Sequence, residues 1–345
     1  DRASPSVDLP AIKYSDYDLP DEYKETLHGI IRDHTNLFIG DRDFVDLTSQ
    51  LSIAHRAFKK MRVKLLADAK TFFVSKPAKP RVTRPQLASN TSAPDLFKSL
   101  HEHSPGIILG EAHAHQSGKK LLIDNMAELA KSDVKVIYLE HLQTDMHQSL
   151  LDDFFKTGKM SLRLDEFLTN QDLGHGIDPS SRYNFSQLVR QARRHGIEVK
   201  ALDCAASYHE RGTPSETPWL NRGEMFSYFA SQIIRADQTR TGGHKWIALT
   251  GNTHANTFQG IPGLAELEGA IGLRVSDSVP GTSRGLRQAL GEVVPPNLPG
   301  RDYHFLKNDY WLEVDIPGTK PRPRALTLAQ INDRLKAPGY FRLDN

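Results

Sequence analysis

The chain has very little cysteine and no long apolar run. Cys204 is the only cysteine among 345 residues, so an internal disulfide and a cysteine-rich zinc module are excluded, and we expect a reducing compartment. No apolar stretch approaches the ~20 residues of a membrane-spanning helix, and no basic-then-apolar leader opens the printed chain. We therefore expect neither a transmembrane protein nor a signal peptide. Because the first residue is Asp1 rather than Met, we expect a piece of a longer protein.

Common catalytic and nucleotide-binding motifs are missing as well. The sequence has no Gly-x-Ser-x-Gly, no Walker loop and no Rossmann glycine pattern. The formal net charge is only +2. We expect no nucleic-acid partner and no cofactor, while a divalent metal ion stays open.

Charge and composition divide the chain into three predicted regions. At ~100–200 residues per domain, this length favours two domains, or one large domain with an appendage. Residues 1–74 are predicted to be a helical region, because apolar residues recur every three, four or seven positions over residues 44–73. Residues 75–93 are predicted to be a proline-rich linker, and residues 94–345 an α/β domain.

A basic block covers part of the helical region and the linker. Its cationic residues, opposed only by Asp68, are Arg56, Lys59, Lys60, Arg62, Lys64, Lys70, Lys76, Lys79, Arg81 and Arg84. One interpretation is the solvated face of a helical bundle. The other is a surface that meets anionic lipid, where each Lys or Arg is worth ~1 kcal/mol.

After the linker, short apolar runs alternate with helical patterns. Strands are predicted at residues 107–110, 134–140, 197–203, 246–251, 273–276 and 310–316. Helices are predicted between them at residues 117–132, 144–155, 181–195 and 221–236. This alternation predicts an α/β fold with a mainly parallel central sheet flanked by helices.

Ionisable residues follow four successive predicted strands. Ligands of such sheets bind outside the carboxyl ends of the strands, where these residues would meet. The ionisable residues are Glu111, His113, His115, Glu140, His141, Asp203 and His254. Gly110 and Gly251 precede two of these groups and would let a substrate approach the backbone closely.

The residue types allow two chemistries. As acid–base groups, one glutamate orients a histidine and another activates water. As ligands, His113, Glu140 and His254 would form a catalytic zinc or manganese site. We also predict substrate contacts from His115, His141, Arg182, Tyr183, Asp203 and Asn252. Cys204 follows a strand, but a buried thiol is the commoner outcome there than a nucleophile.

Three motifs carry a family resemblance over residues 94–316. Gly110-Glu111-Ala112-His113, Glu140 and Gly251-Asn252-Thr253-His254 resemble the superfamily of erythromycin esterases, ChaN-like haem-binding lipoproteins and TIKI/TraB proteases. The Glu-Ala-His-x-His start is most similar to effector domains of large bacterial toxins, namely the Ras/Rap1-specific endopeptidase of multifunctional RTX toxins and the related region of Pasteurella-type toxins.

The resemblance implies a toxin effector hydrolase. Its quartet of active residues falls on Glu111, His113, Glu140 and His254, and the endopeptidase branch works without a metal. The implied substrate is a host protein such as Ras or Rap1. The protein would be secreted by a bacterium and act in the host cytosol, at the inner face of the plasma membrane. The alternatives are an ester or lactone hydrolase and a non-catalytic haem- or metal-binding module.

Overall fold

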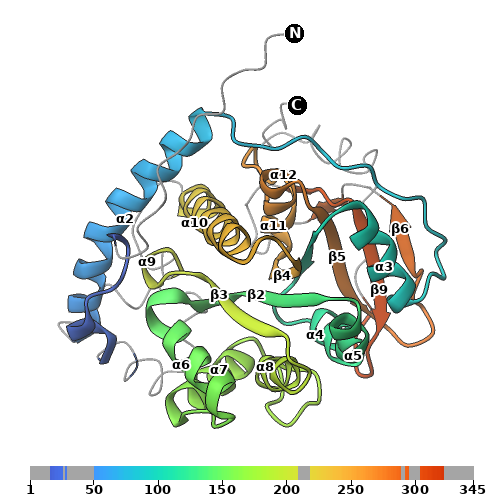
Figure 1. The fold of residues 1–345 in the computed structure, drawn as a ribbon, viewed down its shortest axis with the longest axis horizontal. Helices are drawn as coiled ribbons and strands as arrows, with labels where there is room; N and C mark the ends of the chain where they lie inside the picture. The colour runs from blue at the N-terminus through green and yellow to red at the C-terminus, as the bar shows by residue number, and fades with distance from the viewer. Residues whose placement is uncertain are drawn as a thin grey trace, which may run out of the picture.

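The computed structural model describes residues 16–25, 28, 50–208, 218–288, 292–294 and 304–321. A seven-stranded sheet lies at its centre, with helices on both faces (Figure 1). One face carries α10 (Pro218–Thr241), α11 (Asn252–Ala255) and α12 (Leu264–Glu268). The other carries α4 (Ser117–Asp124), α5 (Met126–Lys131), α6 (Thr144–Thr157), α7 (Leu162–Gly174) and α8 (Phe185–Arg194). Helix α3 (Ala93–His103) leads into the first strand, and α9 (Ala205–Tyr208) follows the third.

The sheet is parallel except at one edge. The strand order is β3 (Glu198–Asp203), β2 (Val134–Gln143), β4 (Lys245–Gly251), β1 (Gly106–Glu111), β5 (Ile271–Ser278), β9 (Tyr310–Asp315) and β6 (Leu286–Gln288). Only β6 runs antiparallel to its neighbour among these strands, while β7 (Glu292–Val294) and β8 (His304–Leu306) pair separately. Every residue of β1 is buried, as a strand covered on both faces requires. This architecture confirms the predicted fold class.

All four helices predicted after the linker have different bounds in the structure. Helices α6 and α10 are longer than predicted, and the other two differ for local reasons. The helix predicted at 117–132 breaks at Asn125, whose side-chain amide donates to the carbonyl of Leu121 and competes with the helical pattern. The helix predicted at 181–195 begins only at Phe185, because the Asn184 side chain caps it by accepting the N–H of Gln187 (2.7 Å). For the helix predicted at 44–73, residues 44–49 lie outside the described residues.

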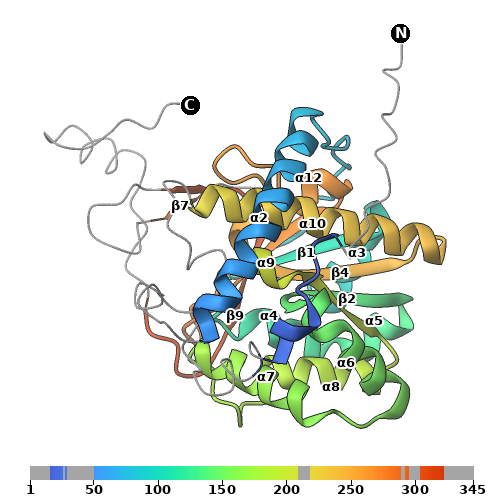
Figure 2. The same cartoon turned by 90° about the vertical axis from the view of Figure 1, so that its left-hand side faces the viewer.

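The described part of the N-terminal region packs on the α/β domain. Helix α2 (Gln50–Val74) lies against α10 and α9 (Figure 2). Leu65, Ala69 and Phe72 of α2 belong to the same hydrophobic core as the sheet. Arg62, one residue of the basic block, is buried and donates to the carbonyl of Ala206 in α9 (2.7 Å). The domain boundaries at residues 74 and 94 stay predictions. None of the described helices is long and apolar enough to cross a membrane.

Residues 75–92 run extended over the surface from α2 to α3 (Figure 1). Hydrogen bonds tie this segment to α12 and to the β9–β6 edge of the sheet, from Lys79 to Glu266 and from Tyr310 and Leu286 to Pro85 and Ser89. Three cations of the basic block form ion pairs here, because Lys79 contacts Glu268 while Arg81 and Arg84 contact Asp309. The predicted linker is therefore attached to the sheet domain along its length.

Candidate active site

The carboxyl ends of the neighbouring strands β2, β4 and β1 bring the predicted residues together. Glu111 ends β1 and pairs in register with Gly251, which ends β4. Strand β2 lies on the other side of β4, and its pairing with β3 becomes irregular after Leu139. The next two residues, Glu140 and His141, are both buried. Such an irregularity turns side chains away from their regular direction. The Glu140 carboxylate here reaches the N–H of Gly251 at the end of β4.

Glu140 is a buried carboxylate held by three groups. Its Oε2 accepts the backbone N–H of Gly251 (2.5 Å), and its Oε1 accepts a hydrogen bond from Nη2 of Arg222 (3.1 Å). The same Oε1 lies 3.5 Å from Nε2 of His254. Burial alone would raise the pKa of Glu140, but His254, His113, Arg222 and the N–H of Gly251 together lower it to about 2. Glu140 is therefore ionised at neutral pH.

His254 is placed by the short helix α11, which begins directly after β4. Its side chain is only 11% exposed, and its ring centroid lies 4.5 Å from that of Phe226 in α10. A Cβ atom on Gly110 would come within 3.0 Å of Ala255 and 3.1 Å of Asn252. The glycine at 110 therefore allows α11 to pack on β1, which brings His254 to Glu140.

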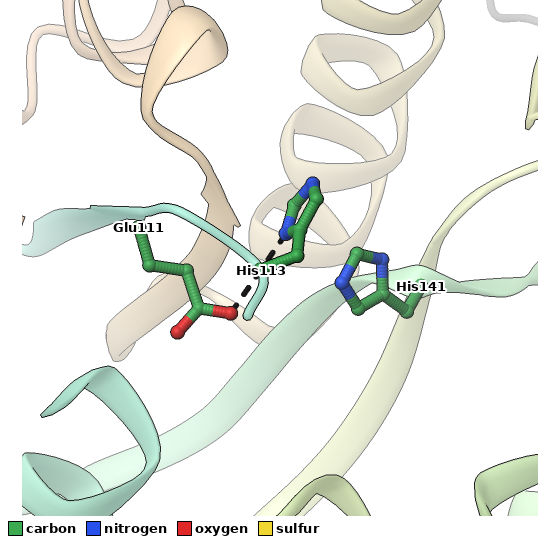
Figure 3. A group of neighbouring side chains, drawn as sticks. All are labelled: Glu111, His113 and His141. Atoms are coloured by element: carbon green, nitrogen blue, oxygen red, sulfur yellow. Dashed lines mark ion pairs between the residues drawn. The ribbon is translucent and has the colours of Figure 1, made fainter. Parts of the chain in front are cut away.

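Glu111 and His113 form a second carboxylate–imidazole pair (Figure 3). Nδ1 of His113 lies 3.8 Å from Oε1 of Glu111. The same oxygen accepts a hydrogen bond from Nζ of Lys119 (2.8 Å), which also donates to the carbonyls of His113 (3.0 Å) and His115 (2.7 Å). Lys119 is fully buried. Its ammonium group thus holds both Glu111 and the loop that carries His113.

His113 also lies close to the Glu140–His254 pair. A Cβ atom on Gly251 would lie 3.1 Å from Nε2 of His113 and 3.5 Å from Oε2 of Glu140, so a glycine leaves room for both. The His113 side chain is 25% exposed, compared with 1% for Glu111, 5% for Glu140 and 11% for His254. A substrate would therefore reach the quartet most easily at His113.

His141 faces the opposite side of the site, toward α8. Its ring centroid lies 4.1 Å from that of His113, and the ring stacks on His175 (4.9 Å, 19°) at the end of α7. Nδ1 of His141 lies 3.4 Å from the hydroxyl of Tyr208. Burial, aided by the positive charge of neighbouring groups, holds the pKa of His141 well below its usual value. His141 is therefore a neutral imidazole at physiological pH.

Asp203 lies behind Glu140, at the end of β3. Its Oδ2 forms an ion pair with Nη2 of Arg222 (2.7 Å), and its Oδ1 accepts the N–H of Cys204 (2.8 Å). Burial raises the pKa of Asp203 to about 6 against the pull of Arg222. Cys204 itself is fully buried, and burial raises the pKa of its thiol well above the usual value. A neutral, inaccessible thiol does not suit the role of nucleophile.

The metal-ligand set differs from the predicted one. Within the described part of the chain, only one group of three or more His, Cys, Asp or Glu residues has its ligand atoms all within 4.8 Å of one another. This group is Glu111, His113 and His141. Two imidazoles and a carboxylate suit zinc. However, Lys119 already supplies a positive charge 2.8 Å from Oε1 of Glu111 and would repel a second cation. The set therefore fits a metal ion poorly, and the mechanism proposed below uses none.

Other predicted residues make contacts elsewhere. Arg182 is largely exposed and forms an ion pair with Asp124 of α4 (3.6 Å), to which the hydroxyl of Tyr183 also donates (3.0 Å). Nδ1 of His115 accepts the N–H of Asp277 at the end of β5 (3.3 Å). The substrate contacts assigned to Arg182, Tyr183 and His115 stay predictions.

Lys119 and Arg222 were not predicted as site residues, although the sequence contains a signal for each. Lys119 lies three residues before the buried Leu122, and Arg222 lies three and four residues before the buried Met225 and Phe226. Residues three or four apart share one face of a helix, so both cations occupy inward-facing positions. A cation on the inner face of a helix, beside a predicted acidic cluster, indicates a buried ion pair.

Comparisons with known proteins identify similar toxins. No protein-family model matches the sequence. The multifunctional-autoprocessing repeats-in-toxin of Vibrio vulnificus is 29% identical over 198 residues, which are 56% of this chain and 4% of that protein. The chain therefore spans a small fraction of this relative's length.

Solved structures of bacterial toxins are also similar. RRSP, a MARTX toxin effector domain from Vibrio vulnificus CMCP6, shows 28% identity and a TM-score of 0.47, covering 55% of this chain and 37% of that one. The C-terminal region of Pasteurella multocida toxin shows 13% identity and a TM-score of 0.48, covering 67% of this chain and 33% of that one.

Proposed function

We propose that this chain is a toxin effector enzyme that hydrolyses a peptide bond in a host protein with paired glutamate and histidine residues. The observation that carries the proposal is the meeting of two carboxylate–imidazole pairs, Glu140–His254 and Glu111–His113, around Gly251. The sequence similarity to the Vibrio toxin over 198 residues supports an effector role. The resemblance to the Ras/Rap1-specific endopeptidase makes a Ras-family GTPase the proposed substrate.

In the proposed mechanism, His254 is the general base. The ionised Glu140 orients its ring and stabilises the imidazolium that forms when His254 takes a proton from water. The hydroxide oxygen adds to the peptide carbonyl carbon, and the carbon–nitrogen bond then breaks. His113, which Glu111 orients, donates a proton to the leaving amine and is reprotonated from solvent, to which His254 releases the proton that it took from water. Cys204 takes no part, in contrast to the thiol-protease-like triad reported for the Pasteurella toxin region.

Purified Ras and Rap1 provide the first test. We expect the wild-type chain to cleave at least one of them, and His113→Ala and His254→Ala to lower kcat by about 10²–10⁴ while the circular dichroism spectrum is unchanged. The matched control is His195→Ala, because His195 is exposed at the end of α8. Full activity of both site variants would exclude the proposed mechanism.

We further propose that one face of α2 contacts anionic lipid. Lys60, Lys64 and Lys70 are exposed there beside Val63 and Val74, which are 66% and 82% exposed. The opposite face of α2 is packed in the core, so these side chains can meet a membrane without unfolding. At ~1 kcal/mol each, the three lysines would raise lipid affinity by about 100-fold.

Vesicles of phosphatidylcholine with phosphatidylserine test this proposal. We expect the triple change of Lys60, Lys64 and Lys70 to Glu to abolish salt-sensitive sedimentation with the vesicles. The control exchanges the exposed Lys131 of α5, Lys156 of α6 and Lys159 for Glu. Equal binding by both triple variants would contradict the assignment.

A further inference from the structure

One face of α10 contacts both members of the Glu140–His254 pair. Arg222 and Phe226 are four residues apart in α10, so their side chains lie on the same face. Arg222 donates to Oε1 of Glu140, and the ring of Phe226 lies against that of His254. The carboxylate comes from β2 and the imidazole from α11. Helix α10 is thus a single element that supports two groups from different parts of the chain.

Arg222 is itself fixed from several sides. It is 8% exposed, and its Nη2 lies 2.7 Å from Oδ2 of Asp203. Its Nη1 donates to Oγ of Ser207 in α9 (2.7 Å). Its guanidinium carbon lies 4.9 Å from the ring centroid of Phe226 and 5.7 Å from that of Tyr208. A planar guanidinium held in this way binds the carboxylates of Glu140 and Asp203 at once, which a lysine ammonium cannot do with the same geometry.

The contact with Glu140 falls on the oxygen that faces His254. Oε1 of Glu140 lies 3.1 Å from Nη2 of Arg222 and 3.5 Å from Nε2 of His254, while Oε2 is occupied by the N–H of Gly251. Without Arg222, Glu140 and Asp203 would be two buried carboxylates with no cation between them. They would then repel each other, and the position of Oε1 would no longer be determined.

We propose that Arg222 is the positioning residue of the Glu140–His254 pair, because it holds Oε1 of Glu140 in the orientation in which this oxygen meets the imidazole. The proposal rests on the hydrolase function proposed above. It assigns no proton transfer to Arg222 and no contact with the substrate.

Kinetics of Arg222→Gln and Arg222→Lys test this role. We expect Arg222→Gln to lower kcat by about 100-fold with KM changed less than about threefold, the pattern of a displaced catalytic group. Arg222→Lys should recover part of the lost kcat, because it keeps the positive charge but lacks the planar set of guanidinium donors. The acid limb of the pH–rate profile, which reports protonation of the general base, should move to higher pH in Arg222→Gln, because the loss of a neighbouring cation favours the protonated form of His254.

The matched control is Arg235→Gln on the same helix. Arg235 forms an ion pair with Glu268 (3.0 Å), whose side chain is 3% exposed, so its loss should lower stability and leave kcat and the pH profile unchanged. A folded Arg222→Gln protein with kcat within threefold of wild type, or with an unmoved acid limb, would overturn the proposal. If Arg222→Gln does not fold, the double variant Arg222→Gln/Asp203→Asn removes the unpaired buried charge. We expect the same loss of kcat and the same shift of the acid limb for this double variant.

A separate measurement distinguishes failure of this proposal from failure of the hydrolase function. An inactive wild-type protein would contradict the hydrolase function alone. The contact between Arg222 and Glu140 is then tested by urea unfolding of Arg222→Gln, Glu140→Gln and the double variant. Non-additive effects on the free energy of unfolding support the contact, and additive effects overturn the role of Arg222.

Discussion

Replacing Lys119 by methionine removes the ammonium group that lies 2.8 Å from Oε1 of Glu111. Nζ of Lys119 donates to Oε1 of Glu111 and to the carbonyls of His113 and His115, and both charged side chains are almost fully buried. Methionine keeps most of the volume but leaves Glu111 buried without a cation. Breaking a buried ion pair in this way costs about 3–5 kcal/mol of unfolding free energy.

Urea unfolding followed by tryptophan fluorescence measures this loss as the deficit of Lys119→Met relative to wild type. Adding Glu111→Gln to the variant should restore part of the stability, because the unpaired charge is then gone.

Lys120→Met is the matched control for this experiment. Lys120 pairs with Asp124 at the surface, where both side chains are about 30% exposed, so its loss should cost less than ~1 kcal/mol. The reasoning is refuted if Lys119→Met loses no more stability than Lys120→Met. It is also refuted if adding Glu111→Gln restores none of the lost stability.

Three further predictions follow from the site. Gly251→Ala should lower kcat at least ~10-fold with little change in melting temperature, because the new Cβ would lie 3.1 Å from Nε2 of His113 and displace this ring. An unchanged kcat would mean that the His113 ring moves aside without cost. Burial raises the pKa of Asp203, and of Asp172 in α7, to about 6, so the folded state binds these protons more tightly than the unfolded state. Their contribution to stability is therefore lost as pH rises from ~4 through 6, and urea unfolding should show a smaller decline between pH 5 and 7 for Asp172→Asn than for wild type. Chelation of divalent ions should leave the cleavage rate within about twofold, since Lys119 already neutralises the candidate ligand set; a large loss reversed by zinc would argue for a metal enzyme.

The sheet was predictable because its central strands β1 and β4 are buried on both faces. Each contains a short apolar run, at residues 107–109 and 246–249, and covered parallel strands have this pattern. Strand β6 has only three residues, and the extended segment 75–92 owes its position to contacts with residues near 266, 286 and 310. Such long-range contacts leave no local periodicity, which is why proline content alone predicted a linker there.

The site could be predicted only as far as strand ends determine position. Glu111 and Asp203 end strands of one sheet, Glu140 lies near the end of another strand, and His254 comes three residues after a fourth. The carboxyl ends of parallel strands share an edge, so these residues had to meet there. The buried cations could not be assigned in this way. Which carboxylate Arg222 meets depends on how α10 crosses the sheet.

The most direct test of the account is mass spectrometry of new protein N-termini in host-cell extract treated with the chain. The wild-type protein and a Glu140→Gln/His254→Ala variant would be compared in water enriched in ¹⁸O. The account predicts cleavage at a defined peptide bond by the wild type alone, with one ¹⁸O incorporated into the new carboxyl terminus. Equal cleavage by the variant, or no new terminus with either protein, would contradict a Glu/His-dependent endopeptidase.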